Sequence, residues 1–178
     1  FIGALPGKIR QNTAYRPFVR SLKTLEDEEY VKAAFPDLRI VHGDLHPRVM
    51  SCRLLVLDSP STTLNIAMAA NIPTICYWNP DHWPQCRQIR PYFERFEKAG
   101  MLFSDATEAA QQVAAVWDDV PGWWNSNDIQ QIRHDWSGQY ARTSPIWWWH
   151  WARTIWSLSR ERAPFPRPKL HKIVGADQ

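Results

Sequence analysis

The sequence has few cysteines, no paired-cysteine motif and no hydrophobic run long enough to cross a membrane. Cys52, Cys76 and Cys86 are odd in number and lack CxxC spacing, which argues against zinc or a disulfide framework and predicts reduced structural thiols. A membrane-spanning helix needs about 20 consecutive apolar residues, and no apolar run here approaches that length. No charged and then apolar leader segment is present either. We therefore expect a cytoplasmic protein.

The length and the charge distribution limit the possibilities further. A chain of 178 residues can bury one domain-sized core. Because it begins at Phe1 without an initiator Met, we expect it to be part of a longer protein. The net charge of +3 equals the balance of residues 160–178, in which five cationic residues face two acidic ones (Arg160, Arg162, Arg167, Lys169 and Lys172 against Glu161 and Asp177). The neutral body argues against nucleic-acid binding, which needs a basic surface stripe, and the tail is either a solvated end or attracted to an anionic membrane.

The segment 54–78, LLVLDSPSTTLNIAMAANIPTICYW, predicts a strand, a polar loop, a short helix and a second strand. Its first four residues are apolar, as in a parallel strand buried on both faces, and the polar loop begins at Asp58. Thr62 or Thr63 can cap the helix, and Asn71 can end it because asparagine tolerates the left-handed conformation. The first N–H groups of this helix would form an anion site at the carboxyl edge of the sheet.

The remaining segments extend the same alternation of strands and helices. We expect helices over 25–35, 92–99 and from Ser104 or Asp105 onwards, strands over 38–41 and 101–103, and a polar loop over 42–47. The predicted fold is α/β, a Rossmann-like parallel sheet flanked by helices, with a Trp-rich helical C-terminal extension. The expected boundaries are 1–14 for a linker or the end of a preceding element, 15–122 for the Rossmann-like domain, 123–160 for the extension and 161–178 for a basic, Pro-rich tail.

The 54–78 pattern is similar to the donor-binding half of GT-B glycosyltransferases. From Tyr15 to Trp156, including FERFEKAGMLFSDATEAAQQVAAVW, the chain resembles transferases of bacterial surface-polysaccharide loci. The resemblance implies that this part binds a nucleotide sugar, while a missing N-terminal domain binds a glycan or lipid-linked acceptor and supplies the general base or nucleophile. No catalytic residue is assigned here, and we expect the isolated chain to bind donor without turnover.

The resemblance also implies a donor-binding set. Ser61, Thr62 and Thr63 would hold the donor phosphate, with Ser59 in the same turn. Arg16 could reach the phosphates with its guanidinium, although it could equally stack on Tyr15 or pair with Glu28 or Glu29. No DxD-type cation site is recognisable, so we expect metal-independent chemistry without a cofactor.

Two positions bear on which donor is used. His46-Pro47 resembles the HP motif of bacterial transferases that use CMP-activated acidic sugars, in which the imidazole donates a hydrogen bond to the phosphate; the alternative is an ordinary turn. Ile66 stands where many GT-B enzymes carry a Glu that contacts the donor's hydroxyls, and Asn65 beside it is expected to face elsewhere on the helix. Either other residues contact the donor's hydroxyls, or the activity of the enzyme is in doubt.

The sequence has eleven tryptophans. Trp147, Trp148, Trp149 and Trp151 cannot share one helix face, because consecutive positions are about 100° apart. They could pack within this domain or against the missing one, stack on sugar rings, or lie at a membrane interface. The alternative function is therefore a non-catalytic carbohydrate-binding or interaction module that uses this surface, and a phosphosugar epimerase is a third possibility.

Overall fold

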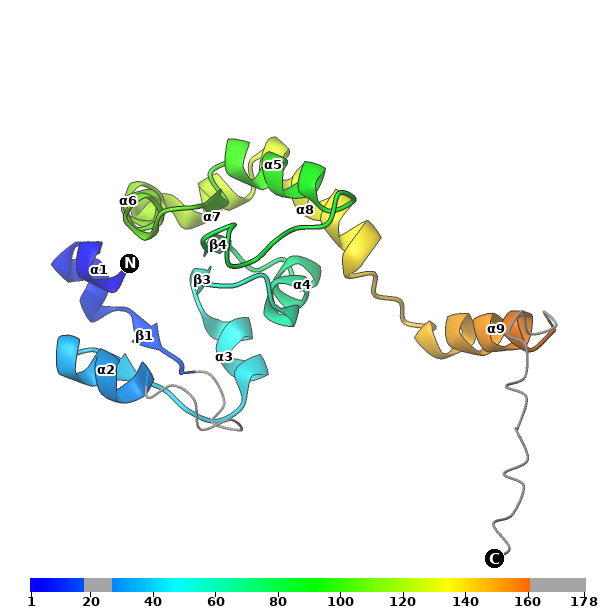
Figure 1. Ribbon diagram of the computed structural model, residues 1–178, viewed down its shortest axis with the longest axis horizontal. Coiled ribbons are helices and arrows are strands. Elements are labelled where there is room, and N and C mark those ends of the chain that lie inside the picture. The colour runs from blue at the N-terminus through cyan, green and yellow to red at the C-terminus, as the bar shows by residue number, and fades with distance from the viewer. Residues whose placement is uncertain (18–26, 161–178) are drawn as a thin grey trace, which may run out of the picture. The chain divides into compact units, whose positions relative to one another are not determined.

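The computed structural model describes residues 1–17 and 27–160 of the chain. These divide into two compact units, one of residues 1–142 and one that begins at Thr143. In the first unit, β1 and β2 form a two-stranded parallel sheet, and β3, β4 and β5 form a three-stranded parallel sheet in that order. Figure 1 shows β3 and β4 with helices of the first unit around them. The strands are β1 (Ala14–Tyr15), β2 (Arg39–Ile40), β3 (Leu55–Leu57), β4 (Thr74–Tyr77) and β5 (Leu102–Phe103).

Helices connect and flank these strands. They are η1 (Ile2–Ala4), α1 (Gly7–Gln11), α2 (Asp27–Ala34), α3 (Leu45–Ser51), α4 (Thr62–Ala69), α5 (Arg90–Lys98), α6 (Ala106–Val116), η2 (Trp117–Asp119), α7 (Val120–Trp124) and α8 (Asn127–Tyr140). The second unit contributes α9 (Trp147–Arg160). Parallel strands flanked by helices confirm the predicted α/β class. No helix in the described part of the chain is long and apolar enough to cross a membrane.

The central strand β4 is buried on both faces, which explains why its sequence is almost continuously apolar. Ile75 packs with residues of α1 and α6 on one face. Cys76 packs with residues of α4, α5 and α8 on the other face, and Trp78, just beyond the strand, joins the same cluster. This alternation places helices on both sides of the three-stranded sheet.

Local signals fix both ends of α4, but the N-cap is Ser61 rather than the predicted Thr62 or Thr63, which lie in the first turn. The Ser61 hydroxyl accepts a hydrogen bond from the Thr63 backbone N–H at the start of the helix. Asn71 has a φ of 56° just after the C-terminal end, and the Ile72 N–H then turns back to the Ala67 carbonyl at 2.9 Å. Pro73 prevents further helix, and β4 follows at once.

The predicted loop over residues 42–47 is wrong in its second half. His46 and Pro47 lie in the first turn of α3 rather than in a loop. Proline is tolerated there because the first N–H groups of a helix have no partner within the helix. The sequence signal of a turn and that of a helix start are therefore the same at this position.

The structure also shows how the ends of the first unit are built. Residues 1–14, expected to form a linker or the end of a preceding element, contain η1 and α1, and Leu5 and Ile9 are buried with residues of α6. α7 and α8, expected in an extension, contribute Trp124 and Trp136 to the same core as α4 and α5. Leu25 of the predicted helix 25–35 and the tail 161–178 lie outside the described residues.

Candidate functional site

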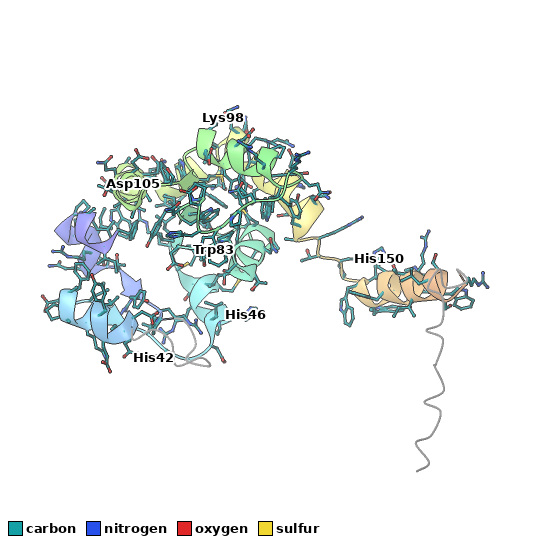
Figure 2. The ribbon with its side chains drawn as sticks, viewed as in Figure 1. His42, His46, Trp83, Lys98, Asp105 and His150 are labelled. Carbon is teal, nitrogen blue, oxygen red and sulfur yellow. The ribbon has the colours of Figure 1, made fainter. Side chains whose placement is uncertain are left out.

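A pocket of about 320 Å³ opens beside the N-terminal end of α4. Its walls are the start of α4, the loop that joins β4 to α5, and aromatic side chains of α5 and α8. Figure 2 shows Trp83, which belongs to this loop and to the pocket wall, near the centre of the first unit. The volume is within the range of about 300–1,000 Å³ that is typical of small-ligand sites.

The N-terminal end of α4 is only weakly capped. The Ser61 hydroxyl accepts from the Thr63 N–H at 3.4 Å, which is longer than the usual N–H···O distance of about 3.0 Å. At the start of α6, by contrast, the Asp105 carboxylate accepts from the Thr107 and Glu108 N–H groups at 2.7 and 2.9 Å. α6 thus supplies its own anion, whereas α4 has a neutral hydroxyl and can still bind an anion from solution.

Two predicted donor-binding residues, Ser61 and Thr62, line the pocket. Thr63 follows them in the first turn of α4 and contributes its backbone N–H to the cap. Ser59 lies just before, with its hydroxyl 3.4 Å from Asp58 Oδ1. The loop and the first turn of α4 therefore present hydroxyl and N–H groups beside the pocket.

Asn65 also lines the pocket, and the sequence analysis did not include it in the site. Its Oδ1 accepts a hydrogen bond of 3.0 Å from Trp136 Nε1, so the Nδ2 group is the end of its amide that can donate to a ligand. A sequence signal for it existed, because Asn65 is three residues after Thr62 and four after Ser61 and therefore shares their helix face. Ile66, the next residue, is partly buried.

Aromatic rings form the opposite wall of the pocket. Trp136 is buried and packs with its ring centroid 4.8 Å from that of Tyr140, and the Tyr140 hydroxyl donates to the Gln88 carbonyl in the loop at 3.4 Å. Trp83 is 47% exposed, so much of its ring surface is free to stack on a planar or sugar ring. Sequence reasoning missed these rings because they come from segments far from α4 in the chain.

Arg16 and His46 are not among the residues that line this pocket. Arg16 follows β1, and its Nη2 donates to the Gly43 carbonyl at 3.1 Å in the loop after β2. His46 is exposed on α3, and Figure 2 shows it apart from Trp83. The six predicted residues therefore divide into a group at α4 and two residues on neighbouring segments.

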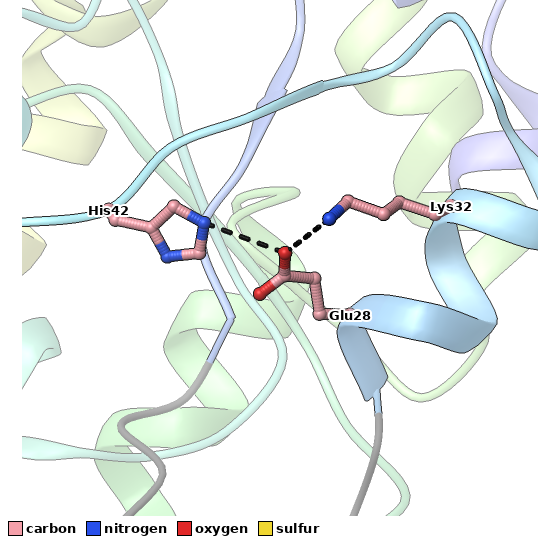
Figure 3. A network of polar contacts seen from close by, with 3 residues as sticks. All are labelled: Glu28, Lys32 and His42. Atoms are coloured by element: carbon pink, nitrogen blue, oxygen red, sulfur yellow. Dashed lines mark hydrogen bonds and ion pairs between the residues drawn. The ribbon is translucent and has the colours of Figure 1, made fainter.

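A polar network lies beside the loop that follows β2. Glu28 of α2 contacts Lys32 Nζ at 2.6 Å and His42 Nε2 at 3.6 Å (Figure 3). Both contacts are made by the same carboxylate oxygen, so Glu28 links its own helix to the loop that carries His42. This network gives His42 a structural role in the fold.

The carboxyl ends of β1, β3 and β4 meet near one carboxylate. Burial, followed by the negative charge of Asp27, raises the pKa of Tyr15 to about 12, and the Tyr15 hydroxyl donates to Asp27 at 3.2 Å. Burial and then Asp58 raise the pKa of Tyr77 to about 12. Asp58 also contributes to the raised pKa of Tyr15. Both phenols are therefore neutral at physiological pH, and the single O–H of Tyr15 is already donated to Asp27.

Metal-binding geometry is not seen in the described residues. Among them, no group of three or more His, Cys, Asp or Glu side chains is arranged to hold a metal ion. The polar chemistry beside the pocket consists instead of hydroxyls, an amide and helix N–H groups. These groups bind anions and sugars through hydrogen bonds.

Comparison with known families defines the class of the protein. The family model of the LIC12162 family transferases matches residues 1–155. The chain therefore belongs to this family of transferases. No curated protein and no solved structure matches it.

Proposed function

We propose that this chain is the nucleotide-sugar-binding, C-terminal part of a GT-B glycosyltransferase that acts in the cytoplasm on bacterial surface polysaccharide. The observation that carries the proposal is the pocket in which Ser61 and Thr62, at a weakly capped helix start, face aromatic rings. Membership of a transferase family supports group transfer. Family membership does not identify the sugar, the nucleotide or the acceptor, so these belong to the proposal.

The pocket suits the two chemically different halves of such a donor. The phosphate would accept hydrogen bonds from the first N–H groups of α4 and from the Ser61 and Thr62 hydroxyls. The base or the sugar would stack on Trp83. Asn65 would donate from its Nδ2 group to a hydroxyl of the donor. It would thereby take the role of the Glu that many GT-B enzymes carry at the position of Ile66.

In this proposal, α4 stabilises the leaving phosphate directly. Charge that develops on the phosphate as the sugar departs would be met by fixed N–H dipoles, and no cofactor is required. The acceptor and the general base or nucleophile would come from another domain. The isolated chain is therefore expected to bind donor and to show no transfer, and detectable sugar transfer by these residues alone would contradict this part.

A CMP-activated donor is the most specific form of the hypothesis. It makes His46 a test residue, because an imidazole N–H would donate to the single phosphate. Arg16 is the second candidate, and its guanidinium donates to the Gly43 carbonyl. Neither residue lines the α4 pocket, so substitutions can separate their roles from that of Thr62.

Calorimetric titration with CMP, UDP and GDP tests the proposal. We expect one nucleotide to bind selectively, and we expect Thr62→Ala to weaken it by about tenfold or more, because a hydrogen bond to a charged group contributes about 1.5–3 kcal/mol. Trp83→Ala should also weaken binding, and His46→Ala should do so only for a CMP donor. Thr107→Ala is the matched control, because Thr107 lies in the first turn of α6, away from the pocket.

The proposal fails if no nucleotide binds, or if Thr62→Ala and Thr107→Ala bind equally well. The alternative function is then an interaction module that binds glycans through exposed tryptophans. It is favoured by the exposure of Trp147, Trp148 and Trp151, each more than half accessible to solvent. That function predicts glycan binding without nucleotide affinity, and its loss when these tryptophans are replaced.

A further inference from the structure

α9 exposes an unusual amount of apolar surface. Six of its large apolar side chains are 57–64% exposed (Trp147, Trp148, Trp151, Ile155, Trp156 and Leu158). Single exposed apolar residues are ordinary, but a contiguous set on one short helix marks a surface that binds something. The helix belongs to the second compact unit of the chain.

The exposed residues are arranged by the helical repeat. With about 100° between successive positions, Trp147, Leu158, Trp151, Ile155 and Trp148 fall within one continuous arc of the helix. Arg153, Ser157, His150 and Thr154 form the polar side, and Trp149 and Trp156 lie outside the arc, next to Arg153. Arg160 lies between Trp149 and Arg153 in this projection, with its guanidinium carbon 4.8 Å from the ring centroid of Trp156. The helix is therefore strongly amphipathic, with cationic groups next to an aromatic surface.

The charge of this region has one sign. Residues 147–160 contain two arginines and no acidic residue. From 147 to the end of the sequence, six cationic residues (Arg153, Arg160, Arg162, Arg167, Lys169 and Lys172) outnumber two acidic ones (Glu161 and Asp177), a balance of +4. Because the whole chain carries +3, residues 1–146 carry −1. The positive charge is thus concentrated in the part of the sequence that begins with α9.

We propose that α9 is an interfacial helix that binds the surface of a membrane containing anionic lipids. Its apolar arc would enter the boundary between headgroups and acyl chains, where tryptophan is favoured. Arg153 and Arg160 would remain at the headgroup level and attract the anionic lipids. At about 1.5 Å per residue, fourteen residues give a helix too short to span a bilayer, so the helix lies in the plane of the membrane. This inference does not depend on the donor pocket.

Vesicle flotation of the full 178-residue chain tests the proposal. Vesicles of equal parts phosphatidylglycerol and phosphatidylcholine should bind the protein, and vesicles of phosphatidylcholine alone should bind it much less. Ile155→Gln should weaken binding about tenfold, because it removes apolar surface from the centre of the arc. Ser157→Gln introduces the same side chain on the polar side and is expected to leave binding unchanged. Arg153→Gln should weaken binding to the anionic vesicles about fivefold, and high salt should have the same direction of effect.

Three outcomes would overturn the proposal. The first is the absence of binding to the anionic vesicles. The second is equal loss of binding in Ile155→Gln and Ser157→Gln. The third is that the unmodified chain does not bind vesicles but self-associates, as seen by light scattering, and that Ile155→Gln abolishes this association. The apolar arc would then bind a second copy of the chain. Circular dichroism of both variants checks that the fold is retained, and Thr62→Ala should bind vesicles as the unmodified chain does.

Discussion

Asn71 has two separate roles in the first unit, and substitutions can distinguish them. Its backbone adopts a φ of 56°, which lets the chain leave α4 and enter β4. Its Oδ1 accepts a hydrogen bond of 2.9 Å from Nε1 of Trp124, a side chain that is 2% exposed. Glycine retains the first role, aspartate retains both, and alanine retains neither.

The expected free energies follow from these contacts. Asn71→Gly leaves the Trp124 N–H without its acceptor, a loss of about 1–3 kcal/mol for a buried donor. Asn71 itself is exposed, so water can replace part of the bond, and we expect a cost of about 1 kcal/mol. Asn71→Ala adds strain of about 1 kcal/mol for a left-handed residue with a Cβ, which gives about 2 kcal/mol. Asn71→Asp should remain within about 0.5 kcal/mol of the unmodified chain.

Urea unfolding measures this order. With an m value of about 2 kcal/mol/M, the transition midpoint should fall by about 0.5 M for Asn71→Gly and about 1 M for Asn71→Ala. Asn125→Ala is the control, since Asn125 also follows a helix but has a φ of −85°. In a Trp124→Phe background, which lacks the indole N–H, Asn71→Gly should have a smaller effect, because only the 3.2 Å hydrogen bond from Gln130 Nε2 to Asn71 Oδ1 is then lost. The reasoning is refuted if glycine is as stable as aspartate, or if alanine is no worse than glycine.

Two chemical probes test the burial of ionisable groups in the first unit. Spectrophotometric titration should show Tyr15 and Tyr77 ionising near pH 12 rather than 10.0. Because the phenols ionise at lower pH in the unfolded chain, their contribution to the free energy of unfolding is present below about pH 10 and is lost as pH rises towards 12. A single transition of all tyrosines near pH 10 in the folded protein would contradict this. Burial raises the pKa of the Cys76 thiol, so a thiol reagent at neutral pH should modify exposed Cys86 quickly and Cys76 only after unfolding, and rapid modification of Cys76 would show that its site is open.

The part of the fold that the sequence could predict is the part fixed by local signals. The strand, helix and strand between residues 54 and 78 follow from apolar runs, a hydroxyl cap and Asn71 at the helix end. Gly100 ends α5 with a φ of 67° for the same local reason. Ser61 and Thr62 could be predicted as site residues because a helix start after a parallel strand is a general anion site. The sequence around His46 predicts a loop, although the residue lies in α3, because proline marks both turns and helix starts.

The rest of the site could not be read locally, because its walls come from distant segments. Trp136 reaches Asn65 across 71 positions of the chain, and no pattern within α8 shows which helix it will contact. Trp83 lies in a loop whose course depends on the packing of rings on both sides. The chemical groups at α4 can therefore be predicted from the sequence, whereas the shape of the pocket depends on tertiary packing.

The tryptophans of this chain have two physically different roles, one in the core of the first unit and one on the surface of α9. In the first unit, the indole N–H groups of Trp124 and Trp136 donate to Asn71 and Asn65, one beyond the end of α4 and one near its start. These bonds hold α7 and α8 to both ends of the helix whose first turn faces the pocket. A helix fixed in this way presents its N–H groups and hydroxyls in one geometry, so a phosphate would bind with little further ordering of the protein. The tryptophans of α9 are more than half exposed, and their rings are free for a surface. Fixed tryptophans thus shape the proposed donor site, and exposed ones supply the proposed membrane contact.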